Sequence, residues 1–236
     1  MLKLRVLLTI AAAAFAVRAA AAGDYVVIEA DGIRIPSGQS VPGAQPLKLE
    51  DGQAVTLLSE NGQTLHIDGP SNAAPDSLAK GGGPTDVPTA ITALITENRA
   101  RTSEVGVVRG ENEVKLPDPW VIDVTHPGTS CVREGMPIVL WRGPPLNAAT
   151  VAFAPKDRSW TVSGAWPANA DRVTLPANMQ LKDSWDYIIE ISGHTAPVTV
   201  RLLPKSVNND AMRAGYMREV GCGNQLNALL ALYQKK

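Results

Sequence analysis

Apolar and polar residues alternate in short runs over most of this chain, as expected for β-strands that bury one face. In the N-terminal part such runs cover residues 25–29, 53–59 and 64–68, and Gly, Pro and Asn-Gly turns separate them. These runs are too short and too closely spaced for helices. The pattern predicts a small β domain over residues 23–72.

A hairpin is expected inside this domain, because Asn61 and Gly62 stand between two strand-like runs. Asn-Gly is a strong local hairpin signal, since both residues tolerate the positive φ that a type I′ turn requires. We therefore predict that residues 53–59 and 64–68 pair as neighbouring antiparallel strands.

Residues 46–59 read PLKLEDGQAVTLLS, and Asn61, Gly62 and the run TLHI at residues 64–67 follow. With this run, the region resembles the FecR-like periplasmic β domain. The resemblance implies an extracytoplasmic β scaffold built of short stacked strands. It implies no catalytic residues.

Residues 73–117 form a connector with one helix in it. The segment 71–84 is rich in Ala, Gly, Pro and Ser, and Thr85 or Asp86 can cap a helix that ends near Asn98. The apolar stripe of that helix follows the i, i+4, i+7, i+8 spacing and consists of Val87, Ile91, Leu94 and Ile95. Soluble proteins rarely leave such a stripe bare, so we expect it to pack on a neighbouring domain.

Strand-like runs return over residues 118–204 and predict a β sandwich. The sandwich is similar to immunoglobulin-like domains, with Tyr187 as a corner tyrosine and Trp141 as a core anchor near Cys131. It departs from them because Cys222 lies beyond the sandwich. The expected strands are 121–125, 129–132, 138–142, 150–154, 159–162, 172–175, 187–191 and 198–203.

The pattern turns helical over residues 205–236. A cap at residues 208–210 begins a first helix that Gly221 ends, and Asn224 can cap a second one. Both helices have apolar residues at i, i+3, i+4 spacing, so we expect them to pack on the sandwich. The expected fold is thus mainly β, with a linker helix and C-terminal helices.

Residues 1–22 read as a secretory signal peptide. Lys3 and Arg5 precede an apolar run over residues 6–17, and small residues follow at 19–22. The run is too short to span a bilayer, so we expect no stable transmembrane anchor after cleavage. The signal predicts a periplasmic or secreted protein.

Export determines how the two cysteines are interpreted. In an oxidising compartment, Cys131 and Cys222 are expected to form a disulfide. Closing a loop of this length contributes about 4 kcal/mol to stability by chain-entropy arithmetic. The alternative pairs Cys131 with His126 as a thiol catalyst, which needs a free thiolate.

Composition and charge exclude some functions. The chain carries 22 Lys and Arg against 23 Asp and Glu, a net charge of −1, and loss of residues 1–22 leaves 19 basic residues and a charge of −4. Nucleic-acid binding needs a clustered basic surface, so no nucleic-acid partner is expected. No standard hydrolase, zinc or dinucleotide motif is present, so we expect no cofactor and no metal site.

Five residues remain as candidate ligand-binding positions. His66 and Asp68 share the solvent face of one predicted strand, although such a pair is common on solvated strands. Trp160, Trp166 and Trp185 could form a sugar-binding platform, whereas tryptophan in a sandwich more often packs in the core.

Three functions follow. The favoured one is a non-enzymatic, exported interaction or scaffold module with a protein or cell-envelope partner. The second is a ligand- or glycan-binding module that uses its tryptophans, and the third is a secreted hydrolase of unrecognised type. An exposed Trp in a groove would favour the second, and a Ser or Asp bonded to a histidine in a pocket would favour the third.

Overall fold

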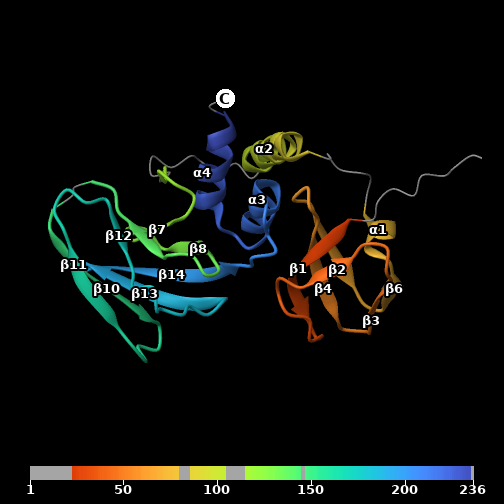
Figure 1. Cartoon of the computed structure of the whole chain (residues 1–236), viewed down its shortest axis with the longest axis horizontal. Helices are drawn as coiled ribbons and strands as arrows, with labels where there is room; N and C mark the ends of the chain where they lie inside the picture. The colour runs from red at the N-terminus through yellow and green to blue at the C-terminus, as the bar shows by residue number, and fades with distance from the viewer. Residues whose placement is uncertain (1–22, 80–85, 105–114, 145–146, 235–236) are drawn as a thin grey trace, which may run out of the picture.

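The computed structural model describes residues 23–79, 86–104, 115–144 and 147–234. Two β-rich parts lie side by side, and three helices lie above the space between them (Figure 1). We call residues 23–79 the first β unit, residues 115–203 the second β unit, and α2, α3 and α4 the helix layer. The expected signal peptide, residues 1–22, lies outside the described residues.

The first β unit contains a four-stranded antiparallel sheet in the order β2-β1-β4-β5 and the two-stranded pair β3-β6. Its core is aliphatic and includes Val27, Leu57 and Ile67. The elements are β1 (Asp24–Asp31), β2 (Ser40–Pro42), β3 (Leu47–Leu49), β4 (Ala54–Leu58), β5 (Thr64–Asp68), β6 (Ser71–Ala73) and the short helix α1 (Pro75–Leu78).

The predicted hairpin is β4-β5, but its turn is not type I′. Gly62 has a φ of +80°, whereas Asn61 is not among the residues with positive φ. The backbone N–H of Gly62 donates to Ser59 O, and the N–H of Ser59 donates to Gln63 O, which gives a three-residue loop. The Asn61 carboxamide Oδ1 accepts from Ser59 Oγ at 2.5 Å, and this contact stabilises the turn.

The helix layer consists of α2 (Val87–Glu104), α3 (Asp210–Glu219) and α4 (Gly223–Gln234). Asp86 caps α2 by accepting from the Thr89 N–H at 3.0 Å, and Asn209 caps α3 by accepting from Met212 N–H at 2.9 Å. The expectation that α2 ends near Asn98 is wrong, because the helix continues to Glu104. No proline or glycine interrupts it there.

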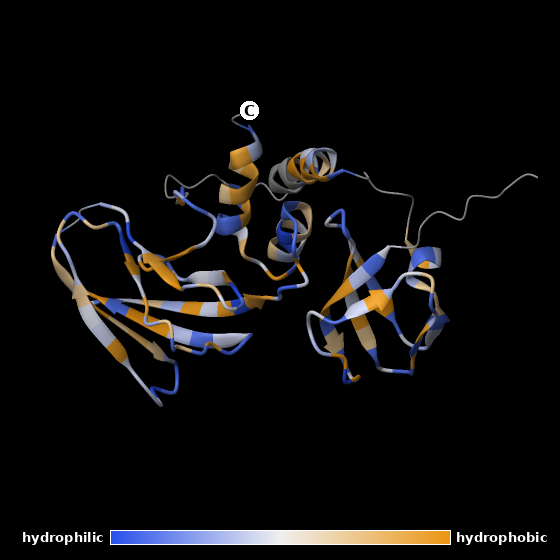
Figure 2. Ribbon diagram, in the orientation of Figure 1, coloured by the Kyte–Doolittle hydropathy of each residue, from blue (hydrophilic) through white to orange (hydrophobic). Residues whose placement is uncertain are grey.

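A single hydrophobic cluster joins the helix layer to both β units. The predicted stripe of α2 is buried in it, with Ile91 and Leu94 almost fully covered. Figure 2 shows hydrophobic and polar stretches alternating along these helices. The first β unit contributes Val26, Ile28 and Leu58, and the second contributes Cys131 and Leu203. The C-terminal helices therefore pack on both units and on α2, and not on the sandwich alone.

The second β unit packs a five-stranded sheet, β11-β10-β13-β14-β8, on a three-stranded sheet, β12-β9-β7. Two strand pairs, β14-β8 and β7-β9, are parallel. The strands are β7 (Val121–Asp123), β8 (Gly128–Arg133), β9 (Val139–Trp141), β10 (Ala149–Pro155), β11 (Val162–Trp166), β12 (Arg172–Thr174), β13 (Trp185–Ile191) and β14 (His194–Leu203). Seven of the eight expected strands are found near their positions; the expected strand at 159–162 is displaced to 162–166.

The core anchor of this sandwich is Trp166 and not Trp141. Trp166 is 0% exposed, and its indole N–H donates to Ala170 O at 2.9 Å while the Arg142 guanidinium lies 4.8 Å from its ring centre. Trp141 is only partly buried, because its neighbour Leu140 takes the inward position on β9.

The first β unit meets the C-terminal part of the chain, residues 204–215, through close contacts. The turn at Gly62 lies against α3, so that a Cβ on Gly62 would collide with the Ala211 carbonyl. A Cβ on Gly215 would collide with the Gly62 carbonyl in the same way. Beside this contact, Ser206 Oγ donates to Gly38 O at 2.8 Å, which fixes a second turn of the first unit.

Candidate functional site

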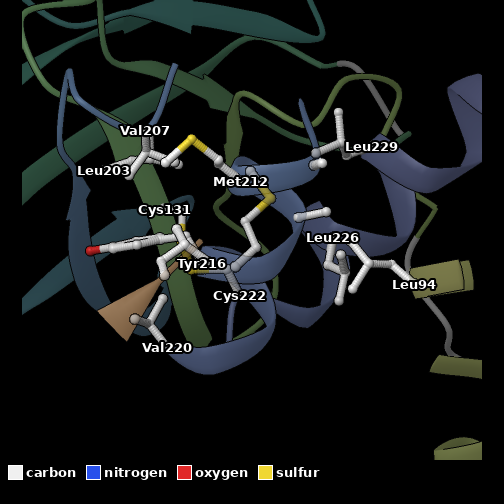
Figure 3. Close-up of a cluster of buried hydrophobic side chains, with 14 of the residues drawn as sticks. Leu94, Cys131, Leu203, Val207, Met212, Tyr216, Val220, Cys222, Leu226 and Leu229 are labelled. Atoms are coloured by element: carbon white, nitrogen blue, oxygen red, sulfur yellow. A yellow bond between two sulfur atoms is a disulfide. The ribbon is translucent and has the colours of Figure 1, made fainter. Parts of the chain in front are cut away.

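Cys131 and Cys222 lie at the joint of the helix layer and the second β unit, and their sulfur atoms are bonded at 1.98 Å. Cys131 comes from β8, and Cys222 lies between α3 and α4 (Figure 3). The two residues are 1% and 0% exposed and pack among apolar side chains. The predicted pairing is therefore present in the structure, and neither thiol is free for the alternative partnership with His126.

The side chain of Gln225 completes this joint. Its Oε1 accepts from the Cys131 N–H at 2.5 Å, and its Nε2 donates to Cys131 O at 2.9 Å. Nε2 also donates to Val121 O at 3.2 Å on β7. Gln225 is 2% exposed, so these bonds satisfy every buried polar atom of its carboxamide. The amide of α4 thus bonds to the β8 backbone as a neighbouring strand would.

His66 and Asp68 lie together on β5, as their spacing predicts. His66 Nε2 is 3.1 Å from Asp68 Oδ1, and the other ring nitrogen, Nδ1, is 3.0 Å from Thr56 Oγ1 on β4. Thr56 is buried, whereas His66 and Asp68 are exposed. The three side chains form a hydroxyl–imidazole–carboxylate chain on an open strand surface.

The other two histidines, far apart in the sequence, both bond to the turn that follows β7. The Asp123 carboxylate is almost fully buried and accepts from Thr125 N–H at 2.8 Å and from His126 Nδ1 at 2.9 Å. His194, at the start of β14, donates from Nε2 to Thr125 O at 3.2 Å. Sequence reasoning missed this cluster. The local signal was Asp123 three residues before His126, which places both side chains on one side of a tight turn.

The three candidate tryptophans have different environments. Trp166 is a core residue, so the hypothesis that it binds a ligand is corrected here. Trp160 and Trp185 are 36% and 38% exposed. Trp160 rests on the rings of Phe153 and Tyr187, with centroids 6.0 and 6.1 Å away, and Lys182 Nζ lies 4.6 Å from the centre of the Trp185 ring.

Trp160 lines a groove at one end of the sandwich, with a volume of about 640 Å³. We call this the Trp160 groove. Its surface is apolar apart from two carboxamides, and it is lined by Trp160, Val162, Pro176, Asn178, Met179 and Gln180. An exposed ring beside amide donors and acceptors can bind a neutral ligand that has both apolar faces and hydroxyl groups.

A second, smaller pocket of about 360 Å³ lies on the outer surface of the five-stranded sheet. Its polar centre is Asp186, which accepts from Thr199 Oγ1 at 2.8 Å and from Lys156 Nζ at 3.2 Å. These two interactions hold the pKa of Asp186 below its usual value, the Thr199 hydrogen bond being the larger cause. No histidine lines either of these two pockets.

No protein-family model matches the chain, and no curated protein is similar to it in sequence. Within the described parts of the chain, no helix is both long and apolar enough to cross a membrane.

Proposed function

We propose that this chain is an exported, non-enzymatic interaction or scaffold module, with a FecR-like first β unit and an immunoglobulin-like second β unit. The observation that carries the proposal is the buried Cys131–Cys222 disulfide. Such bonds persist in oxidising compartments and are rare where thiols are kept reduced. The basic and apolar residues 3–17 supply the matching export signal.

The way the β units are joined supports a scaffold role. The helix layer packs on both β units. Where the Gly62 turn of the first unit meets α3, there is no room for a side chain on Gly62 or on Gly215. Ion pairs reinforce the joint: Arg201 of β14 donates to Glu29 of β1 at 2.9 Å, and Arg218 of α3 donates to Glu97 of α2 at 2.6 Å. A rigid joint presents the surfaces of both units in one fixed arrangement.

The likeness to immunoglobulin domains is supported by Tyr187. Its hydroxyl accepts from the Lys182 N–H at 2.9 Å, five residues upstream. A tyrosine at the start of a late strand whose hydroxyl bonds to the preceding backbone is a feature of many such sandwiches.

Export and oxidation can be tested together. The full chain and a variant without residues 1–22 are produced in a bacterial host, and free thiols are labelled after denaturation in acid. We expect both cysteines of the full chain to be unreactive and the protein to be found outside the cytoplasm, while the truncated chain is labelled at both. Full-length protein that stays in the cytoplasm with reactive thiols would refute the proposal.

The partner is tested by cross-linking the oxidised protein in the cell envelope of its own source. A photoreactive residue at Trp185, which is exposed, is compared with one at Trp166, which is buried. A specific adduct from position 185 that is absent with position 166 and competed by unlabelled protein supports an interaction module. The absence of any competed adduct from exposed positions on either β unit counts against it.

A second candidate function, glycan or ligand binding, is favoured by the position of Trp160. An exposed ring in a groove with two carboxamides suits stacking on a pyranose and hydrogen bonds to its hydroxyls. Soluble cello-, chito- and malto-oligosaccharides are titrated while tryptophan fluorescence is followed. Saturable quenching that Trp160→Ala abolishes and Met136→Ala preserves is the expected result, since Met136 is an exposed apolar residue elsewhere. Unsaturable or equal responses in all three proteins would reject this candidate.

A further inference from the structure

The edges of the larger sheets differ in how they are protected. An edge strand has unpaired N–H and C=O groups, and proteins protect it with charges, proline or a covering element. At β8 the covering element is α4, because Gln225 occupies both backbone groups of Cys131. The disulfide holds α4 in that place.

Four other edge strands carry their own protection. On the first β unit, β2 contains Pro42 and β5 contains His66 and Asp68. On the three-stranded sheet, β7 contains the buried Asp123, and β12 contains Arg172, which forms ion pairs with Asp118 and Asp171. Each of these edges would bring a charge or a missing N–H to an added strand.

β11 lacks this protection. It is the outer strand of the five-stranded sheet, its described strand neighbour is β10, and its sequence VSGAW contains neither a charge nor a proline. Ser163, Gly164 and Ala165 are exposed. No described atom lies within 4 Å of where a Cβ on Gly164 would be, so the face of the sheet at this residue is open.

We propose that β11 is a self-association surface, where a second copy of this chain adds its own β11 antiparallel across a two-fold axis at Gly164. The pairing would place Ser163 of one copy opposite Ala165 of the other, and Val162 opposite Trp166. The two five-stranded sheets would then form one continuous sheet.

A second copy fits this edge because the strand is self-complementary. In an isologous interface residue i of one copy lies opposite residue j of the other and j opposite i, so only the residue on the axis meets its own copy. That residue is Gly164, and Ser163 and Ala165, which pair across the axis, are small and uncharged. The pairing therefore brings no like charges and no bulky side chains together at its centre.

The oligomeric state tests the proposal. The full chain, with its disulfide intact, is studied by sedimentation velocity over a wide range of protein concentration. We expect a reversible monomer–dimer equilibrium. The double variant Ser163→Lys, Ala165→Lys should raise the dissociation constant about tenfold or more, because the lysines of the two copies lie opposite one another.

The matched control is Thr195→Lys. Thr195 is an exposed strand residue of the same sheet, but it lies on β14 opposite Glu190 of β13, and β13 and β10 separate it from β11. This variant adds a positive charge without touching the β11 edge, and we expect the wild-type equilibrium.

The register is tested by a cysteine at the axis. Residues opposite one another in an antiparallel pair have Cα atoms about 4.5–5.5 Å apart, within the range of a disulfide. Mild oxidation of Gly164→Cys should therefore give a covalent dimer, and Thr195→Cys should not. A chain that stays monomeric at all concentrations, or a dimer unaffected by the two lysines, would overturn the proposal.

Discussion

Gly62 and Gly215 lie where the β4-β5 turn meets α3, and each occupies space that a side chain would need. The first prediction concerns this contact. Gly62→Ala should lower the free energy of unfolding by about 2–4 kcal/mol, because it adds strain at positive φ and a collision with the Ala211 carbonyl. Urea unfolding measures the change.

Gly52→Ala is the matched control. Gly52 has a φ of +77°, close to that of Gly62, but no atom lies within 4 Å of the added Cβ. In this control the free energy of unfolding should fall by only about 1 kcal/mol, from the strain at positive φ. Equal losses for the two variants would show that the contact with α3 contributes nothing.

Tyr216 of α3 gives a second prediction. Its hydroxyl donates to Leu202 O at 2.8 Å, and burial, the largest cause, raises the pKa of Tyr216 well above its ordinary 10.0. In the unfolded chain the phenol ionises near its ordinary value, whereas in the folded chain it stays neutral. Above about pH 10 the unfolded state therefore binds fewer protons than the folded state. The free energy of unfolding then falls as the pH rises through about 10.

Tyr216→Phe removes this ionisation. Near neutral pH the variant should be about 1 kcal/mol less stable, because the hydrogen bond to Leu202 O is lost. Between about pH 9 and pH 11 its stability should fall less steeply than that of the wild type. Tyr233→Phe is the comparison, since Tyr233 is only partly buried and the largest cause of its raised pKa is its hydrogen bond to Asp210, at 2.7 Å, and not burial. Identical pH profiles for wild type and Tyr216→Phe would contradict this account.

At the scale of elements, the attachment of α4 to the edge of β8 depends on a side chain as much as on a covalent bond. Gln225→Met keeps the shape of the side chain but leaves the Cys131 N–H and C=O without partners. Buried unpaired groups are costly, so we expect a loss of about 2–4 kcal/mol in urea unfolding with the disulfide still formed. Gln45→Met, at an exposed position, should change stability by less than about 0.5 kcal/mol. A loss no larger than that of the control would mean that the amide does not stabilise the edge.

At the scale of the whole molecule, the helix layer makes one cooperative structure of two β units. All five tryptophans lie between residues 120 and 185, in the second β unit, so none of them lies in the first β unit. Far-ultraviolet circular dichroism reports both units. Because one hydrophobic cluster is shared, we expect the two signals to give the same transition.

Leu94→Ala extends this prediction. Leu94 of α2 is buried in the shared cluster. Its truncation should lower the free energy of unfolding by about 2–4 kcal/mol, equally by fluorescence and by dichroism. Leu232→Ala, at a half-exposed position on α4, should shift neither appreciably. Fluorescence and dichroism transitions that separate in the wild type would show that the units unfold independently.

The sequence by itself determined what depends on neighbouring residues. The period of apolar positions predicted the β4-β5 hairpin, most strands of the second β unit and the buried stripe of α2. Two cysteines behind a predicted export signal predicted the disulfide. His66 and Asp68 were brought together by the two-residue repeat of a strand. In each case the interaction follows from local geometry or from having a single possible partner.

Only the tertiary structure decided what depends on packing between distant segments. His194 bonds to the Thr125 carbonyl because β14 and β8 pair in parallel, which no local pattern indicates. Trp160, Trp166 and Trp185 lie in similar sequence surroundings, yet one fills the core and two reach solvent. The turn at Gly62 packs closely on α3, and of the two edges of the five-stranded sheet α4 covers β8 while β11 stays open. Burial and edge protection are properties of the assembled sheets, so they arise only when segments far apart in the chain come together.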